Sequence, residues 1–324
     1  MTDFIERTRR VRAHGHRFYF RLCHILLLLF LAIQFLPDKV GSGLRQGEII
    51  FVLALELLCI VVLAFGKNKR GMNLFRDNLF CDIVSFLYLL LIIWELLTAK
   101  FNILKPSFFP PPGAVFEQAV RDGPIIFENI GTSLGIVVQG YLLALIVAIP
   151  LGLFLGWSVR LGSAATYISK FLSSIPPVVY IPYGIALLPT FRSVSVMVIF
   201  LASFWPALAG TMSGVLNVER EIIDSGRSLN VGKLSMLFQI ILPASLSQIF
   251  IGCNQGLSVS FILLTSAEMI GARSGLGYYV KNFSDLGDYT RIITGVLVIG
   301  IVVTIVVFFF NKLQQFLLRW KSSE

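Results

Sequence analysis

Long apolar runs recur along this chain of 324 residues, and they limit the folds open to it more than any other feature. A run of about 20 apolar residues is long enough to cross the hydrocarbon core of a bilayer as a helix. The runs hold continuous Leu, Ile, Val and Phe, without the ten-residue alternation typical of a membrane β-barrel. Charged residues make up only 14% of the chain, against about 25% in soluble domains. The sequence therefore predicts an all-α polytopic membrane protein.

Eight membrane spans fit the pattern, and the basic N-terminal segment is typical of a retained signal-anchor helix. The predicted spans cover residues 18–36, 48–65, 79–98, 132–157, 165–188, 193–215, 244–266 and 291–311. With the N-terminus in the cytoplasm, eight spans return the C-terminus to the same side. Lys and Arg then favour the cytoplasmic segments by about two to one, as the positive-inside rule expects. We therefore expect a multi-pass chain with both termini in the cytoplasm.

Nucleic-acid binding, metal binding and catalysis have little support. Cationic cytoplasmic loops explain the net charge of +9. The four cysteines lie in or beside apolar runs without metal-ligand spacing, and the three histidines lie near the N-terminus, far in sequence from any carboxylate cluster. The phosphate-binding pattern GxxxxGK[ST] does not occur in the sequence. We therefore expect no enzyme activity, metal or cofactor in this chain itself.

A polar segment, residues 217–243, "NVEREIIDSGRSLNVGKLSMLFQIILP", separates the sixth and seventh predicted spans on the cytoplasmic side. Asn217 is a favourable N-cap, and Glu221 suits the first turn of a helix. Asn230 tolerates the left-handed conformation that ends a helix, and Pro243 suits the first turn of the next one. We expect a short helix, a sharp turn and a second helix leading into the membrane. Such a hairpin can dock on a soluble partner, or it can lie at the lipid interface.

This segment resembles the signature loop of permease subunits of ATP-binding-cassette importers, in which Glu-Ala-Ala is followed by three residues, Gly, nine residues and Ile-x-Leu-Pro. The chain has Asp224-Ser225-Gly226, then Asn230, then Ile240-x-Leu242-Pro243, with every spacing kept. The flanking stretches, over about residues 79–320, are similar to the permeases for sulfonates, taurine, nitrate, bicarbonate and related solutes. They include "FFPPPGAVF" (108–116), "SSIPPVVYIPYGIALLP" (173–189) and "SAEMIGARSGLGYYV" (266–280).

The resemblance implies the transmembrane fold of a type I importer in a bacterial inner membrane. The core of about six spans would cover residues 79–324, and residues 1–78 would add two N-terminal spans. The implied partners are a second permease subunit, identical or paired, two cytoplasmic ATPase subunits that bind ATP and Mg, and an external solute-binding protein. The implied solute is small and anionic. The residues expected to couple to the ATPase are Glu221, Asp224, Ser225, Gly226, Arg227, Asn230, Lys233 and Pro243.

Prolines and small residues in the core spans permit kinks and close helix contacts, which are tolerated beside a cavity. The candidates for a translocation pathway are Pro176, Pro177, Tyr180, Tyr183, Ser203, Trp205 and Glu268. Ordinary helix packing is an equal alternative for the kinked spans. For Glu268, a structural role in the external loop is favoured over solute contact.

Two other classes of function stay open on the residues alone. Glu56 and Glu95 lie within apolar runs, where acidic residues are costly and mark functional sites by default. They leave an ion-coupled secondary transporter or channel as the alternative. A membrane scaffold or enzyme without a transport role is the third hypothesis.

Overall fold

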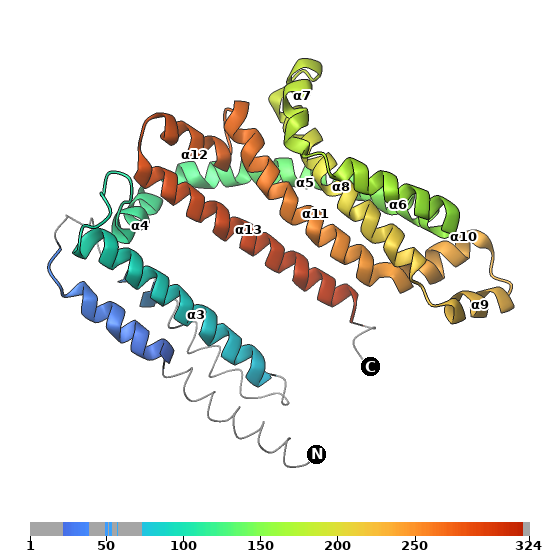
Figure 1. The fold of residues 1–324 in the computed structure, drawn as a ribbon, viewed down its shortest axis with the longest axis horizontal. Coiled ribbons are helices and arrows are strands. Elements are labelled where there is room, and N and C mark those ends of the chain that lie inside the picture. Colours follow the sequence, from blue (N-terminus) through green and yellow to red (C-terminus); the bar gives the residue numbers. More distant parts are fainter. Residues whose placement is uncertain (1–21, 39–48, 51, 54–56, 58–72, 320–324) are drawn as a thin grey trace, which may run out of the picture. The chain divides into compact units, whose positions relative to one another are not determined.

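The computed structural model describes residues 22–38, 49–50, 52–53, 57 and 73–319 (Figure 1). Within this part of the chain all of the regular structure is helical, which confirms the predicted all-α class. Glu56 and most of the predicted span 48–65 lie outside the described residues.

Five helices in the described part are long and apolar enough to cross a membrane, by length and composition. They are Cys81–Lys100, Gly123–Trp157, Phe191–Leu216, Lys233–Gly271 and Tyr289–Leu317. Each overlaps one of the predicted spans. The first of them is the end of α3 (Asn73–Glu95) with the turn η1 (Leu96–Lys100), and the fourth is α11 (Leu242–Gly271) with the short elements before it. The others are α5 (Gly123–Trp157), α8 (Phe191–Leu216) and α13 (Tyr289–Leu317), and Figure 1 labels all five α-helices. The first predicted span contains the shorter apolar helix Leu22–Gln34.

The predicted span 165–188 is wrong as a single helix. The chain forms α6 (Val159–Ser173), a bend, the 3-10 turn η2 (Pro177–Tyr180) and α7 (Ile181–Leu187). The two consecutive prolines at the bend are the physical reason. A proline supplies no N–H to the helix ladder, and it disfavours a helical backbone at the residue before it. Pro176, which precedes Pro177, accordingly has a ψ of 122°.

Two compact units divide the chain, and each is described by itself. One comprises Met1–Gly123 with Gly287–Thr294, and the other comprises Pro124–Leu286 with Gly295–Glu324. The predicted boundary at residue 78 follows the resemblance, and it stays a prediction.

A buried cation organises the first unit, which includes α3, η1 and α4 (Pro112–Arg121). The Lys100 ammonium donates hydrogen bonds to Asp38 Oδ1 at 2.6 Å and to the Leu36 carbonyl at 2.8 Å. It also lies 4.0 Å from a carboxylate oxygen of Glu95. Because all three ionisable side chains are largely buried, their mutual pairing offsets much of the cost of removing them from water.

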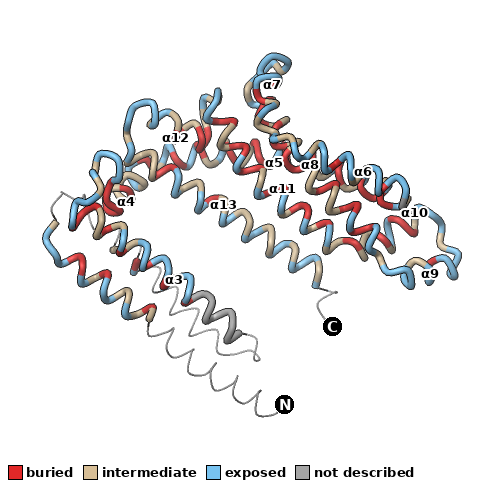
Figure 2. Tube along the Cα trace, in the orientation of Figure 1, coloured by how far each residue is buried: buried red, intermediate tan, exposed pale blue. Residues whose placement is uncertain are grey.

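Close helix contacts organise the second unit. Its core joins α5, α8 and α11, and Figure 2 shows buried positions running along these helices. A Cβ added to Gly252 of α11 would lie 2.5 Å from the Pro206 carbonyl of α8 and 2.9 Å from Gly210 Cα. The two backbones can approach this closely only because both positions are glycine. The outer faces carry many exposed apolar side chains, as lipid-facing helices require.

Candidate functional site

The polar segment 217–243 forms the predicted helix, turn and helix. It contains α9 (Arg220–Ser228), α10 (Lys233–Ser235) and a π-helical turn η3 (Met236–Ile241), which runs directly into α11. Pro243 lies in the first turn of α11, as predicted. A proline there cannot bond the carbonyl four residues earlier, and a π-turn is one way for a helix to accommodate this.

The predicted N-cap is wrong. Asn217 ends α8 as its C-cap residue, and its Nδ2 donates a hydrogen bond to the Ser213 carbonyl at 2.8 Å. Glu219 is the N-cap residue of α9, and its side chain makes no capping bond. Asn217 is recruited by α8 because that helix continues as far as Leu216.

Asn230 ends α9 in the left-handed conformation that the sequence predicts, with a φ of 53°. The Asn230 N–H donates to the Arg227 carbonyl at 2.9 Å, and the Val231 N–H donates to the Gly226 carbonyl at 3.1 Å. These two bonds form a Schellman motif, which reverses the chain direction at a helix end. The turn therefore brings α9 back against η3.

Gly226 permits that contact within the chain itself. It is buried, and an added Cβ would lie 2.7 Å from Met236 Cε and 2.9 Å from Ile240 Cδ1. Gly226, one of the residues expected to couple to the ATPase, thus makes its close approach to η3 instead. Met236 in turn belongs to a buried cluster with Leu153 of α5 and Val215 of α8. The polar segment is therefore anchored to the membrane helices on its inner side.

The outer side of the segment is exposed, and it carries charged side chains together with apolar ones such as Leu229 and Leu234. Of the residues expected to couple to a partner, Glu221, Asp224, Ser225, Arg227, Asn230 and Lys233 are exposed, and Pro243 is half-buried. Arg227 pairs with Asp224 at 3.3 Å. A hollow of about 470 Å³ adjoins the helix, lined by Gly156, Trp157, Val215, Leu216, Val218, Arg220, Ile223, Asp224, Arg227 and Ile241. The surface thus combines exposed charges with a recess that can receive side chains.

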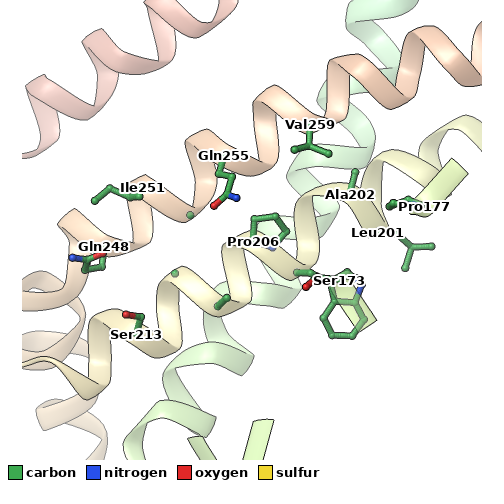
Figure 3. Close-up of a pocket in the computed structure, with 14 residues that line it drawn as sticks. Ser173, Pro177, Leu201, Ala202, Pro206, Ser213, Gln248, Ile251, Gln255 and Val259 are labelled. Carbon is green, nitrogen blue, oxygen red and sulfur yellow. The ribbon is translucent and has the colours of Figure 1, made fainter. Parts of the chain in front are cut away.

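A groove of about 450 Å³ runs along α8 and α11 beside η2 (Figure 3). Its lining is Ser173, Pro177, Leu201, Ala202, Trp205, Pro206, Ala209, Gly210, Ser213, Gln248, Ile251, Gly252, Gln255 and Val259. All of these side chains are uncharged, and the polar groups are hydroxyls, amides and one indole. Figure 3 shows Gln255 reaching from α11 toward the side of Pro206. Because Pro206 has no N–H, it also leaves the carbonyl of Ala202 without its helical donor.

The structure brings only some of the pathway candidates to this groove. Pro177 and Trp205 line it, whereas Pro176, Tyr180 and Tyr183 do not. Ser203 is fully buried, and its hydroxyl lies 2.6 Å from the Ser260 hydroxyl between α8 and α11. Sequence reasoning missed Gln248 and Gln255. Their seven-residue spacing in an apolar run was the available signal, because it places both amides on one helix face.

Glu268 lies in a separate buried network. Its Oε1 accepts a hydrogen bond from Ser133 Oγ of α5, and its Oε2 accepts one from the Gly277 N–H, both at 2.7 Å. Ser133 Oγ also accepts a bond from the Leu276 N–H at 2.9 Å. Gly275, with a φ of 117°, passes so close to the Glu268 carboxylate that no side chain fits there. This geometry joins the turn between α11 and α12 (Leu276–Asp285) to α5, which supports the structural role favoured for Glu268.

Comparison with known proteins places the chain in a family. The family model described as binding-protein-dependent transport system inner membrane component matches residues 148–323. A probable ABC transporter permease protein from Brucella melitensis is 34% identical over 211 residues, 64% of this chain and 84% of that protein. The taurine transport system permease protein TauC of Escherichia coli is 27% identical over 247 residues, 74% of this chain and 90% of TauC. The nitrate import permease protein NrtB of a Synechocystis strain is 29% identical over 227 residues, 66% of this chain and 80% of NrtB.

These matches confirm the resemblance seen in the polar segment and its flanks. They identify a multi-pass permease subunit of an ABC transporter in the inner membrane, which is not itself an enzyme. This chain belongs to the family of binding-protein-dependent transport system inner membrane components.

Proposed function

We propose that this chain forms, together with a second permease subunit, the translocation pathway of an ATP-driven importer for a small solute that bears an oxoanion group. The observation that carries the proposal is the groove between α8 and α11, because its polar lining lies within spans and is open along one side. A second permease, identical or paired, would complete that side. The names of the relatives TauC and NrtB, for taurine and nitrate, support the solute class.

The polar segment is the element that would couple the groove to ATP. Two cytoplasmic ATPase subunits would bind ATP and Mg and receive the exposed face of α9. An external solute-binding protein would deliver the solute to the opposite side. Gly226 of α9 packs against η3, and the cluster that holds Met236 and Leu237 of η3 also holds Val215 of α8. A displacement of α9 would therefore move both η3 and α8. The groove walls are α8 itself and α11, into which η3 continues. Closing of the ATPase pair would thereby change the access of the groove.

The test is a charge reversal on α9. The double variant Asp224→Lys, Arg227→Glu should reduce co-purification of the ATPase and ATP-driven uptake of taurine or nitrate, because both charged side chains are exposed on the face of α9 that would meet the ATPase. Lys281→Glu is the control, since Lys281 is a partly exposed cation that is also paired along a short helix, with Asp285 on α12. Normal assembly and uptake in the double variant would overturn the coupling role.

The ion-coupled alternative receives no support from Glu95. Its carboxylate lies in the first unit beside the Lys100 ammonium, and a paired carboxylate is a poor site for an exchangeable cation. Uptake that survives mutation of the catalytic lysine in the ATPase would favour this alternative over ATP-driven import. A thermal-shift screen of the partner solute-binding protein with taurine, nitrate and bicarbonate would test the solute class separately.

A further inference from the structure

The two glutamines of the groove point to a property that family membership does not supply. We infer that Gln248 and Gln255 are the specificity-determining residues of the pathway. Their amides form hydrogen bonds with a small oxoanion-bearing solute as it passes, and no charged side chain of the groove retains it. This inference rests on the proposed function and deepens it by naming the side chains that meet the solute.

The helix geometry places the two amides in line. Seven residues along an α-helix make about two turns, so Gln248 and Gln255 lie on one face of α11, separated by about 10 Å along its axis. Gly252 lies between them, at the point where α11 touches the backbone of α8. The two side chains therefore flank the helix contact and reach into the groove from either side of it (Figure 3). Gln255 is at the middle of the predicted span 244–266.

Both side chains are exposed, and neither amide has a hydrogen-bond partner among the residues that the structure describes. Lipid cannot satisfy an amide group, so the unpaired amide of Gln255, at the middle of the predicted span, strongly disfavours contact with hydrocarbon. Water, a solute or a polar partner surface must cover this face. The helix α8 contributes the Ser213 hydroxyl and the Trp205 indole to the same groove. Hydrogen-bond donors therefore line the groove on both α8 and α11.

The charge of the lining narrows the solute chemistry further. Amide, hydroxyl and indole groups can all donate to the oxygens of a sulfonate, nitrate or carbonate group. The lining contains no Lys or Arg that would retain an anion, and no Asp or Glu that would repel one. Conduction needs binding that is favourable enough to enter and weak enough to leave. An uncharged row of donors meets both requirements for a small anion.

The first experiment measures whether the face is open to water and anions. The permease is first made without its four native cysteines and assembled with its ATPase. In this complex, the cysteine introduced by Gln255→Cys should react with the anionic reagent 2-sulfonatoethyl methanethiosulfonate. Leu142→Cys is the control, because Leu142 is an exposed apolar residue near the middle of α5 and outside the groove lining. The inference falls if the cysteine at 255 reacts no faster than the one at 142, since lipid or a second chain would then cover the face.

The second experiment measures charge sensitivity. With Gln248→Cys as the reporter, adding Gln255→Glu should slow the sulfonate reagent about tenfold, because like charges about 10 Å apart repel by that ratio at an effective dielectric constant of about 20. The cationic trimethylammonium reagent should instead react faster. Gln139→Glu, an exposed amide of α5 outside the groove lining, should change neither rate by as much. An unchanged sulfonate rate with Gln255→Glu would overturn the inference.

The proposed function and this inference fail separately. The cysteine at 255 could react at the same rate in the nucleotide-free complex and in the complex trapped with ATP and vanadate. Access to the groove would then not be driven by ATP, and the proposed function would fail while the role of the two glutamines stands. If the rate depends on nucleotide but the two reagents respond alike to Gln255→Glu, import stands and the selecting role falls.

Discussion

Removing the carboxylate of Glu268 is the sharpest test of how the C-terminal end of α11 is held. Glu268→Ala deletes the bonds from Ser133 Oγ and the Gly277 N–H, both 2.7 Å long, around a side chain only 1% exposed. Each bond contributes about 1–3 kcal/mol to stability, so the loss of the two should total about 2–6 kcal/mol. For a unit of this size 1 kcal/mol shifts the melting temperature by about 2–4 °C, so the fall should be on the order of 10 °C. Thermal unfolding in lipid nanodiscs, followed by tryptophan fluorescence, measures this fall.

Two further variants make that prediction refutable. Glu128→Ala removes an exposed carboxylate from α5, so its melting temperature should match that of the unmodified chain. Glu268→Gln can keep both bonds as neutral ones if its amide oxygen faces Gly277, so its loss should be smaller than that of Glu268→Ala. A melting temperature for Glu268→Ala equal to that of Glu128→Ala would refute the structural role. Full stability of Glu268→Gln with lost uptake would move Glu268 to the solute pathway.

Three more variants test the packing and the turn. Asn230→Val should reduce ATPase co-purification, because a β-branched residue at a φ of 53° costs about 1–2 kcal/mol or more, whereas Asn230→Gly should keep it. Gly252→Ala should lower the yield of monodisperse protein in size-exclusion chromatography, because overpacking against α8 costs about 1–3 kcal/mol. Gly300→Ala should leave the yield unchanged, because a Cβ added there meets nothing within 4 Å. Lys100→Met should lower the melting temperature of the chain, because the buried carboxylate of Asp38 loses its cation at a cost of about 3–5 kcal/mol. An unchanged melting temperature would show that this ion pair contributes little to stability.

Local chemistry in the sequence predicted several elements correctly. Five of the predicted spans coincide with long apolar helices, because uninterrupted apolar residues leave no other way to satisfy the backbone in a membrane. Asn230 was identified as the end of α9 because few residues adopt the left-handed conformation. The predicted span 165–188 failed for a local reason too. We expected the prolines of this span to permit a kink, but Pro176 and Pro177 together divide it into two helices, because neither supplies an N–H to the helix ladder.

The candidate site likewise has parts that the sequence predicted and parts that it did not. The exposed charges of α9 follow from its own sequence, since charged side chains stay in water while the opposite face packs against η3. Which side of Gly226 is covered depends on Met236 and Ile240, and only the reversal at Asn230 brings them there. The pathway residues were harder to predict. Ser203 and Trp205 are separated by one residue of α8, yet one is sealed against Ser260 and the other lines the groove.

The sequence by itself thus determined the helical membrane class, the position of the polar segment and the permease family, because these depend on composition, period and local motifs. Only the tertiary structure decided that Glu268 joins Ser133 and Gly277, and that Gln248 and Gln255 share a groove with α8. The reason is physical. The function of a polar side chain in a membrane depends on which neighbour satisfies it, and those neighbours come from helices distant in sequence.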